Sequence, residues 1–253
     1  MTNLYDKKCL FWDYLWSFCQ AVLLTSYFII FAYMKIIISG YGKMGRMIEA
    51  LLKGRGITPA ACSEDICSTP TELAGESVCI DFTTPDAFRA NYKFIASNFK
   101  AAVIGTTGWY DIKDEVFGAF EKHCTPMIWA ANFSIGVNAL FAAVEKTSRV
   151  LNGHGYVPHI SETHHIHKLD APSGTAKILG DIVAGGLGQV PEISSFREGE
   201  VPGIHTVEFL SDCDKLTFTH EAFSRQGLAE GAITAAFLTE GLSGVHEFKD
   251  LII

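Results

Sequence analysis

The stretch that decides the fold is Lys35-Ile-Ile-Ile-Ser-Gly-Tyr-Gly-Lys-Met-Gly45. Its β-branched opening is typical of a buried strand. A Gly-x-Gly-x-x-Gly pattern follows the strand and precedes a helical pattern at residues 46–52, the context in which these glycines indicate dinucleotide binding. Gly40 permits a tight turn, Gly42 lets the backbone approach a pyrophosphate, and Gly45 allows close helix–strand packing. The alternative is an ordinary glycine turn.

Strands and helices alternate after this motif. We expect strands at 57–62, 78–82, 101–105 and 127–131, and helices at 85–97 and 111–123. Alternation of this kind predicts a parallel sheet covered on both faces, an α/β fold of the doubly wound Rossmann type. Ligands of such sheets bind beyond the carboxyl ends of the strands.

Small or polar residues follow the predicted strands at 81–84, 105–108 and 130–133. Each segment alone would be a plain turn, but together they outline one crevice suited to a ribose and a nicotinamide. An acidic residue after the second strand typically binds the adenosine ribose, and Glu64, with Ser63 beside it, occupies that place. The choice between NAD and NADP stays open, because Lys43 could meet a 2′-phosphate.

The second half of the chain has a different pattern. We expect helices at 134–152 and 173–185 and strands at 156–163, 194–197, 204–210 and 215–220, which predict an α+β domain with an open mixed sheet packed on helices. The uncovered face would form a subunit contact. A last helix, at 228–239, would return to the first domain.

The predicted domain organisation follows from that return. Residues 35–133 and 228–253 form a dinucleotide-binding domain, and residues 134–227 form a substrate-binding and oligomerisation domain. Because the chain then crosses twice between the domains, we expect a hinge and closure over bound ligands.

The chemical centre is expected in the stretch Glu162-Thr-His-His-Ile-His-Lys-Leu-Asp-Ala-Pro-Ser-Gly-Thr-Ala176. Three histidines and Lys168 lie between a strand end and a helix start, and a helix N-terminus binds anions through free N–H groups. This combination predicts a site for a small acidic molecule. A surface accident and a zinc site are the alternatives. Zinc is disfavoured because side chains on an extended segment alternate sides and no further ligands stand nearby at zinc spacing, so we expect no metal.

Composition narrows the class of protein. The chain has 253 residues, of which 48% are hydrophobic and 19% charged, so it is not disordered. A net charge of −8 without a basic block disfavours a nucleic-acid partner. The seven cysteines are odd in number and include no Cys-x-x-Cys pair, which indicates free thiols in a reducing, cytoplasmic compartment.

Residues 1–34 differ from the rest of the chain. An apolar, aromatic run extends from Cys9 to Met34 after two lysines, and its length would span a bilayer. We expect Met34 to be the true start and the preceding residues to be a wrongly assigned extension, in which case no membrane partner is expected. A genuine membrane anchor is the alternative.

Taken together, the motifs resemble those of the 4-hydroxy-tetrahydrodipicolinate reductases of the diaminopimelate pathway of lysine biosynthesis. The resemblance covers Lys35 to the C-terminus and is most specific in the stretch 162–176. Residues 80–83, 105–108 and 130–134 are also similar to family segments, as are Arg197-x-Gly with Gly203-x-His.

The resemblance implies a two-domain reductase, usually a homotetramer, that uses NADH or NADPH to reduce a cyclic hydroxy-dicarboxylate. It makes His164 the proton donor and Lys168 its catalytic companion. The implied substrate contacts are His165, Lys168, Gly174 and Thr175. The implied cofactor contacts are Gly40, Tyr41, Gly42, Lys43, Met44, Gly45, Gly105, Thr106, Thr107, Ala130, Ala131, Asn132 and Phe133, with Ser63 and Glu64 expected at the ribose.

Two features depart from the common family pattern. The glycine loop is shorter than in many members, and residues 188–215 form a compact segment, which together indicate a short-form subgroup. His205, His220 and Arg225 are interpreted as structural. The rival functions are another dehydrogenase of a small amino or hydroxy acid, an NAD-sensing module without catalysis, and a zinc hydrolase.

Overall fold

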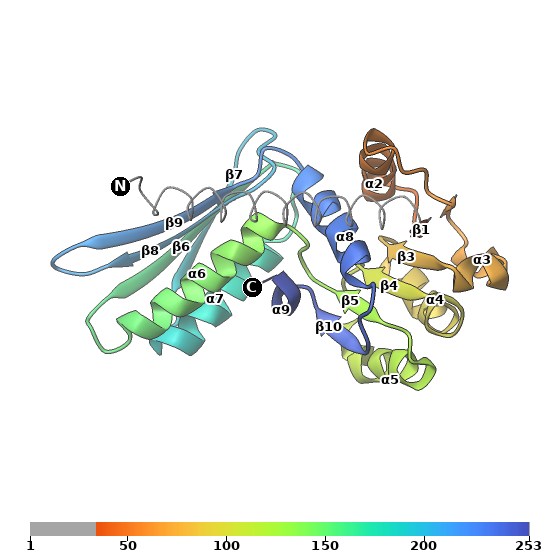
Figure 1. Ribbon diagram of the computed structural model, residues 1–253. Coiled ribbons are helices and arrows are strands. Elements are labelled where there is room, and N and C mark those ends of the chain that lie inside the picture. Colours follow the sequence, from red (N-terminus) through yellow and green to blue (C-terminus); the bar gives the residue numbers. More distant parts are fainter. Residues whose placement is uncertain (1–33, 253) are drawn as a thin grey trace, which may run out of the picture.

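The computed structural model describes residues 34–252, which are organised by two β-sheets (Figure 1). The first sheet has the strand order β10-β5-β4-β3-β1-β2, and every neighbouring pair is parallel. This confirms the predicted doubly wound sheet. Its strands are β1 (Lys35–Ser39), β2 (Ala61–Ser63), β3 (Ser77–Asp81), β4 (Ala101–Ile104), β5 (Met127–Trp129) and β10 (Val245–Glu247).

Helices cover both faces of this sheet because its strands are apolar on both sides. In β1, Ile36 and Ile38 point to one face and Ile37 to the other, as the two-residue period of a strand requires. The first face packs on α2 (Lys43–Gly54) and α8 (Gln226–Leu238). The other face packs on α4 (Pro85–Asn98) and α5 (Lys113–His123).

Shorter elements complete this half of the molecule. They are η1 (Ile66–Ser68), α3 (Thr71–Gly75), η2 (Tyr110–Ile112) and α9 (Lys249–Ile252). Strand β10 was not anticipated from the sequence. It pairs in parallel with β5, with Val245 opposite Met127, and three residues are too few to show a periodic pattern.

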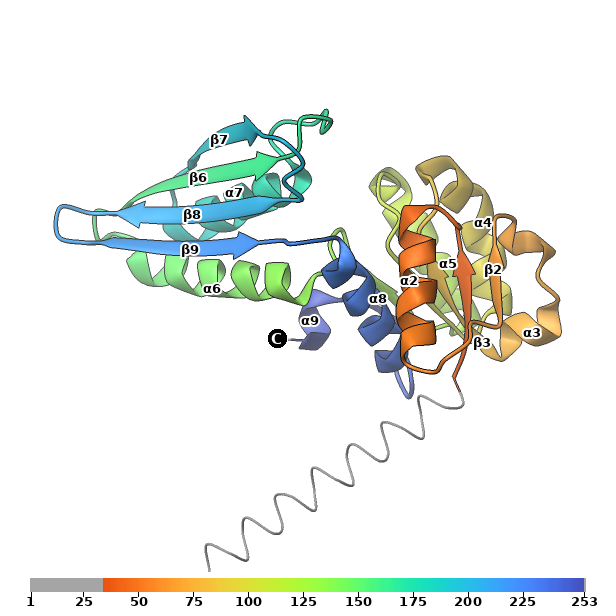
Figure 2. The same ribbon diagram turned by 90° about the horizontal axis from the view of Figure 1, so that it is seen from above.

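The second sheet is mixed, with the order β7-β6-β8-β9. Its strands are β6 (Val157–His164), β7 (Glu192–Arg197), β8 (Ile204–Leu210) and β9 (Lys215–Glu221). Strand β7 runs parallel to β6, and the other pairs are antiparallel. Helices α6 (Ile135–Leu151) and α7 (Gly174–Leu187) pack on one face around a shared apolar core, seen behind the strands in Figure 2. Within residues 34–252 no helix covers the opposite face, so the predicted open mixed sheet is confirmed.

A serine caps the N-terminus of both helices of this half, one residue before each helix begins. The Ser134 hydroxyl accepts a hydrogen bond from the Val137 amide at 3.3 Å, and the Ser173 hydroxyl accepts one from the Ala176 amide at 3.2 Å. Side-chain capping of this kind satisfies an N–H group that has no partner within the helix. The cap at Ser173 therefore places Gly174 and Thr175 in the first turn of α7.

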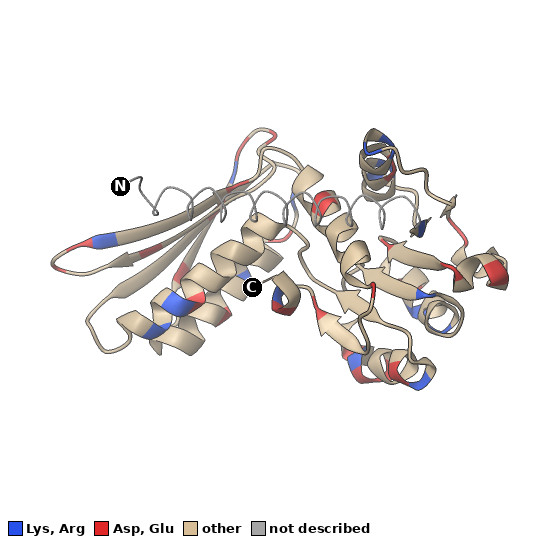
Figure 3. Cartoon of the chain, in the orientation of Figure 1, with Lys and Arg blue, Asp and Glu red and all other residues tan. Residues whose placement is uncertain are grey.

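The chain passes between the two sheets twice, after β5 and after β9 (Figure 1). In that view the arrowheads of β3 and β4 point toward the second sheet, so the carboxyl edge of the first sheet faces the other half of the molecule. Acidic and basic residues are interspersed along α5 and α6 (Figure 3). Across residues 34–252, no helix combines the length and apolar character needed to cross a bilayer. The prediction that Met34 is the true start, and the alternative of a membrane anchor, concern residues 1–33, which lie outside the described residues.

Candidate active site between the two sheets

A cavity of ≈ 500 Å³ lies where the two halves of the molecule meet. The first half contributes Asn132, from the crossing after β5, and the start of α8. The second half contributes His164 at the end of β6, His165 and Lys168 in the turn that follows, and Thr175 in the first turn of α7. The structure thus brings four of the predicted catalytic and substrate residues together beside a predicted cofactor residue.

Asn132 joins the two halves directly. Its side-chain amide donates to the hydroxyl of Thr175 at 3.4 Å, while its carbonyl oxygen accepts from the Ser134 amide at 2.8 Å. The main-chain oxygen of Asn132 also accepts a hydrogen bond from Asn138 at 2.9 Å. The segment that follows β5 is therefore held against the start of α7.

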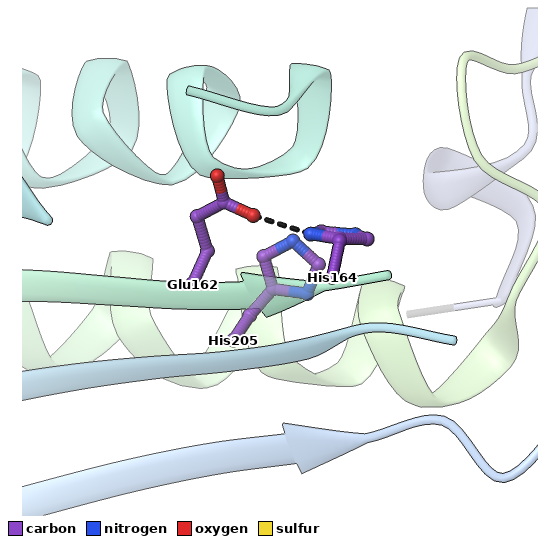
Figure 4. A group of neighbouring side chains, drawn as sticks. All are labelled: Glu162, His164 and His205. Carbon is purple, nitrogen blue, oxygen red and sulfur yellow. Dashed lines mark hydrogen bonds and ion pairs between the residues drawn. The ribbon is translucent and has the colours of Figure 1, made fainter. Parts of the chain in front are cut away.

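Strand geometry places Glu162 next to His164. The two residues are two positions apart in β6, so both point to its buried face. Nδ1 of His164 is hydrogen-bonded to Oε2 of Glu162 (Figure 4). The other carboxylate oxygen accepts a hydrogen bond from Nη1 of Arg197, in β7, at 3.1 Å. The imidazole is thus anchored by a buried carboxylate that is itself ion-paired.

Burial and neighbouring charges shift the pKa values of both Glu162 and His164. Burial raises the pKa of the Glu162 carboxyl, but the hydrogen bonds with His164 and Arg197 favour its ionised form, so its pKa is lowered overall. Burial lowers the pKa of His164, and the positive charges of Lys168 and Arg197 act in the same direction, against the opposing effect of Glu162. The resting pair is therefore a carboxylate and a neutral imidazole near pH 7.

Arg197 also holds the loop that carries Lys168. Its Nε donates to the main-chain oxygen of Lys168 at 3.2 Å, and its Nη2 donates to that of Asp170 at 2.5 Å. The Lys168 ammonium donates to the Asp170 carboxylate at 2.8 Å, which lowers the pKa of Asp170. One guanidinium therefore positions the His164 anchor and the lysine loop together.

Strand β6 ends at His164, so His165 and His167 do not continue an extended segment, as the interpretation against zinc required. Residues 165–168 form a turn, in which the Lys168 amide donates to the His165 carbonyl at 3.1 Å. The rings of His165 and His167 consequently lie 6.0 Å apart, rather than on opposite sides of an extended segment. His165 lines the cavity, whereas the exposed His167 lies 3.1 Å from Glu200.

A different trio could supply metal ligands. Donor atoms of Glu162, His164 and His205 lie within 4.8 Å of one another. Both oxygens of Glu162 are already hydrogen-bonded, one to His164 and one to the cationic Arg197. This donor set suits a paired carboxylate better than a divalent cation, and the absence of a metal stays a prediction.

His205, which was interpreted from the sequence as structural, lies beside His164. It lies opposite Glu162 in the β6–β8 ladder, and its ring packs edge-on to His164 with centroids 5.1 Å apart (Figure 4). Its Nε2 is 3.1 Å from the Ser173 hydroxyl. Burial, with the nearby His164, lowers the pKa of His205 to about 4. His220 and Arg225 also line the cavity, so all three residues interpreted as structural form its wall.

The predicted cofactor residues lie at the carboxyl edge of the first sheet. Gly40 has a φ of 87°, and a Cβ there would come within 2.4 Å of the Phe82 carbonyl oxygen. A Cβ at Gly45 would come within 2.1 Å of the Gly40 oxygen. Gly42, by contrast, has open space beside it and caps α2 without a side-chain hydrogen bond. The first amides of α2 are thus presented for an anion.

The ribose candidates stand at the same edge. Ser63 ends β2, pairs in register with Ser39, and accepts a hydrogen bond from the Gly40 amide through its carbonyl at 2.9 Å. Glu64 follows it and is exposed. An acidic side chain is therefore available next to the glycine turn.

A buried carboxylate ties three strand ends together. Asp81, at the end of β3, accepts hydrogen bonds from Ser39 at 2.7 Å, from Thr83 at 3.0 Å and from Thr106. Burial raises the pKa of Asp81, and these hydrogen bonds partly oppose the shift. Thr106 is consequently held inside by this network, while Thr107 is exposed. Asp81 belongs to the predicted crevice, and no sequence pattern indicated a role for it.

Two family models match most of the chain. The model described as dihydrodipicolinate reductase, N-terminus, matches residues 54–133, and the one described as dihydrodipicolinate reductase, C-terminus, matches residues 136–252. The glycine loop lies just ahead of the first match. Glu162, His164, Lys168 and the rest of the cavity stretch lie within the second.

Curated relatives carry the same description. The 4-hydroxy-tetrahydrodipicolinate reductase of Christiangramia forsetii is 36% identical over 236 residues, which covers 87% of this chain and 98% of that protein. The enzyme of the same name from Ralstonia nicotianae is 33% identical over 263 residues, covering 87% of this chain and 99% of that one. A relative from Neisseria meningitidis is 36% identical over 216 residues, covering 77% and 78%.

The fold is also found among solved structures. A dipicolinate-bound dihydrodipicolinate reductase from Paenisporosarcina sp. TG-14 has a TM-score of 0.71 at 20% identity, covering 86% of this chain and 99% of that one. An amine dehydrogenase from Mycobacterium smegmatis has a TM-score of 0.56 at 7% identity, covering 85% and 95%. These likenesses show a shared architecture.

Proposed function

The chain belongs to the dihydrodipicolinate reductase family, and we propose that it acts as a 4-hydroxy-tetrahydrodipicolinate reductase dependent on NADH or NADPH. In the overall reaction a hydride replaces the substrate hydroxyl, which leaves with a proton as water. The observation that carries this proposal is the cavity that joins His164, His165, Lys168 and Thr175 to Asn132. A reductase needs a proton donor and an anion anchor beside its cofactor crevice, and these side chains supply both.

The cofactor residues fit a dinucleotide. The start of α2, which has no side-chain cap, would hold the pyrophosphate. Glu64 with Ser63 would bind the ribose, and residues 105–107 and 130–133 would line the nicotinamide end. A nicotinamide bound there supplies the hydride. Asn132 lies at the boundary between this crevice and the cavity, so positioning is the main task of the protein.

The substrate anchors carry positive charge. Lys168 contributes an ammonium group to the cavity wall. Gly174 and Thr175 lie in the first turn of α7, where helix amides have no intrahelical acceptor. Together these groups would neutralise one carboxylate of a dicarboxylate, and His165 lies beside them.

His164 would supply the proton that balances the hydride. Burial and two nearby cations lower the pKa of His164. A dicarboxylate in the cavity brings negative charge to the ring, which favours the imidazolium form. Bound substrate would therefore promote the charged form that general acid catalysis requires.

We further infer that residues 35–133 with 228–253 bind the cofactor and that residues 134–227 bind substrate and mediate assembly. The face of the second sheet opposite α6 and α7 supports a subunit contact, because no helix among residues 34–252 covers it. The homotetramer that we propose for this assembly is what the family resemblance implies. The described cysteines are free thiols, in keeping with a reducing, cytoplasmic location.

A coupled assay tests the function. The hydroxy-tetrahydrodipicolinate is generated in situ, and oxidation of NADH and of NADPH is followed separately. We expect substrate-dependent oxidation of at least one of them. The proposal fails when neither is oxidised above background, and turnover of another small amino or hydroxy acid would then identify the alternative dehydrogenase.

A further inference from the structure

We propose that Glu162 is a positioning residue for His164: it holds the imidazole with hydrogen on Nδ1 and leaves Nε2 to face the substrate. The inference rests on the proposed function only in making Nε2 the atom that donates the proton. Glu162 itself would touch neither substrate nor cofactor, because it does not line the cavity.

The tautomer follows from the hydrogen bond. Glu162 has a fully buried side chain, and its second oxygen is paired with Arg197 at 3.1 Å, which stabilises the ionised carboxylate. A carboxylate can only accept, so the hydrogen between it and His164 belongs to Nδ1 of the ring. Nε2 of a neutral imidazole is then the free lone pair, and Nε2 of the imidazolium carries the transferable proton.

Gly203 shows where Nε2 points. A Cβ built on Gly203 would lie 3.0 Å from Nε2 of His164, nearer than from any other atom of the ring. Gly203 and His164 both line the cavity. A side chain at position 203 would fill the space beside Nε2, which the glycine leaves open.

Glu162 is also the counter-charge of the site. Within the described part of the chain, four ionisable groups face His164: Glu162 from its own strand, Arg197 from β7, His205 from β8 and Lys168 from the turn. Behind them, Asp170 pairs with Lys168, and His220 lies opposite His205 in the β8–β9 ladder. Among the four, Glu162 alone favours the imidazolium, so its loss would leave His164 charged only at lower pH.

Side-chain NMR of the full-length protein, without substrate, tests the tautomer directly. Long-range nitrogen–proton spectra distinguish hydrogen on Nδ1 from hydrogen on Nε2. The signals of His164 are identified as those that the wild type shows and the variant His164→Asn lacks. We expect the Nδ1–H form in the wild type. An Nε2–H form would overturn the proposal without any variant having to fold, and signals that change on adding a chelator would replace it with a metal site.

The variant Glu162→Gln removes the charge but keeps an acceptor. We expect the titration of His164 to move down by about one pH unit or more, because an opposite charge at hydrogen-bond distance shifts a pKa on that scale. The pH above which kcat declines should move with it, while KM changes less. The matched control is Glu200→Gln, which breaks a Glu–His pair of 3.1 Å on the surface and should leave the His164 titration in place.

The outcomes separate this inference from the proposed function. A folded Glu162→Gln protein with an unchanged His164 titration contradicts the positioning role, even when the wild type is an active reductase. A wild type that lacks reductase activity but shows the Nδ1–H tautomer and the downward shift contradicts the function and leaves the Glu162–His164 relationship standing.

Discussion

The amide of Asn132 donates a hydrogen bond to the hydroxyl of Thr175 at 3.4 Å, across the boundary between the two sheets. Asn132 follows a strand of the first sheet, and Thr175 lies in the first turn of a helix packed on the second. This contact places the predicted nicotinamide end of the crevice next to the predicted carboxylate anchor. The geometry needed for hydride transfer is thus a property of how the two halves meet.

Replacing Asn132 by Asp should weaken substrate binding. The variant keeps the oxygen that accepts from Ser134 but loses the donor to Thr175 and adds a negative charge beside a dicarboxylate site. We expect KM for the substrate to rise about tenfold, equivalent to ~1.4 kcal/mol. Steady-state kinetics measure it. Asn152→Asp, at a site whose amide bonds Gly186 away from the cavity, is the control, and an equal rise in both variants would contradict the assignment.

Removing either proposed catalytic group should reduce turnover strongly. We expect His164→Ala and Lys168→Ala each to lower kcat by roughly 100-fold or more, the scale of general acid–base groups. His167→Ala, in the same loop but exposed, should retain activity. Near-normal kcat in both of the first two variants, with their fold confirmed by circular dichroism, would refute the roles given to them.

A methyl group at position 203 should obstruct His164. In Gly203→Ala the new Cβ would lie 3.0 Å from Nε2, a distance at which a neighbour must yield. We expect kcat/KM to fall about tenfold or more, since a misplaced acid loses part of the usual general acid contribution. Gly118→Ala, in helix α5 with open space around it, is the control. Unaltered kcat/KM in Gly203→Ala would show that substrate approaches the ring from elsewhere.

Stability should decline on acidification because His205 is buried as a neutral ring. The pKa of His205 is about 4 in the folded chain, against 6.5 for an unperturbed histidine. The unfolded chain binds the proton first as pH falls, so the contribution is complete above pH 6.5 and is lost between there and about pH 4. Its full size is about 3 kcal/mol.

Urea unfolding at several pH values measures this slope. His205→Gln should flatten it between pH 6.5 and 4, whereas His154→Gln, at an exposed turn, should not. Burial likewise lowers the pKa of His164 and of His220, so part of the slope remains in the first variant. A His205→Gln protein with the full wild-type slope would mean that this ring is not held neutral.

Loss of Glu64 should weaken cofactor binding without affecting the chemical step. The residue is exposed at the end of β2, beside the glycine turn. We expect Glu64→Ala to raise the Kd of the preferred nicotinamide about tenfold, with kcat retained at saturation. Fluorescence titration measures Kd, with Glu72→Ala in the first turn of α3 as the control. Normal binding by Glu64→Ala would remove the ribose role.

Local patterns in the chain were sufficient for most of the longer elements of both halves and for the site stretch. The isoleucines of β1 and the glycines after them predict the strand, turn and helix because backbone conformation and burial there follow from neighbouring residues. The spacing of Glu162 and His164 also carried a signal that was not used, since residues two apart in a strand share a face.

Other features were decided by strand pairing between distant segments. Arg197 reaches Glu162 because β7 lies parallel to β6, and His205 reaches it because β8 lies antiparallel to the same strand. Strand β10 is recognised by its parallel pairing with the edge of β5. None of these neighbours is visible in a local pattern, because register is set by packing across the sheet.

The sequence by itself therefore determined the doubly wound fold and the glycine turn, through periodicity and backbone preferences that act over a few positions, and its clustered histidines and Lys168 marked the candidate site. Only the tertiary structure decided which groups shift the pKa of His164, orient its ring and bury it. Those groups come from three strands and a turn, and the energies that bring them together depend on burial and electrostatic pairing in a low-dielectric interior.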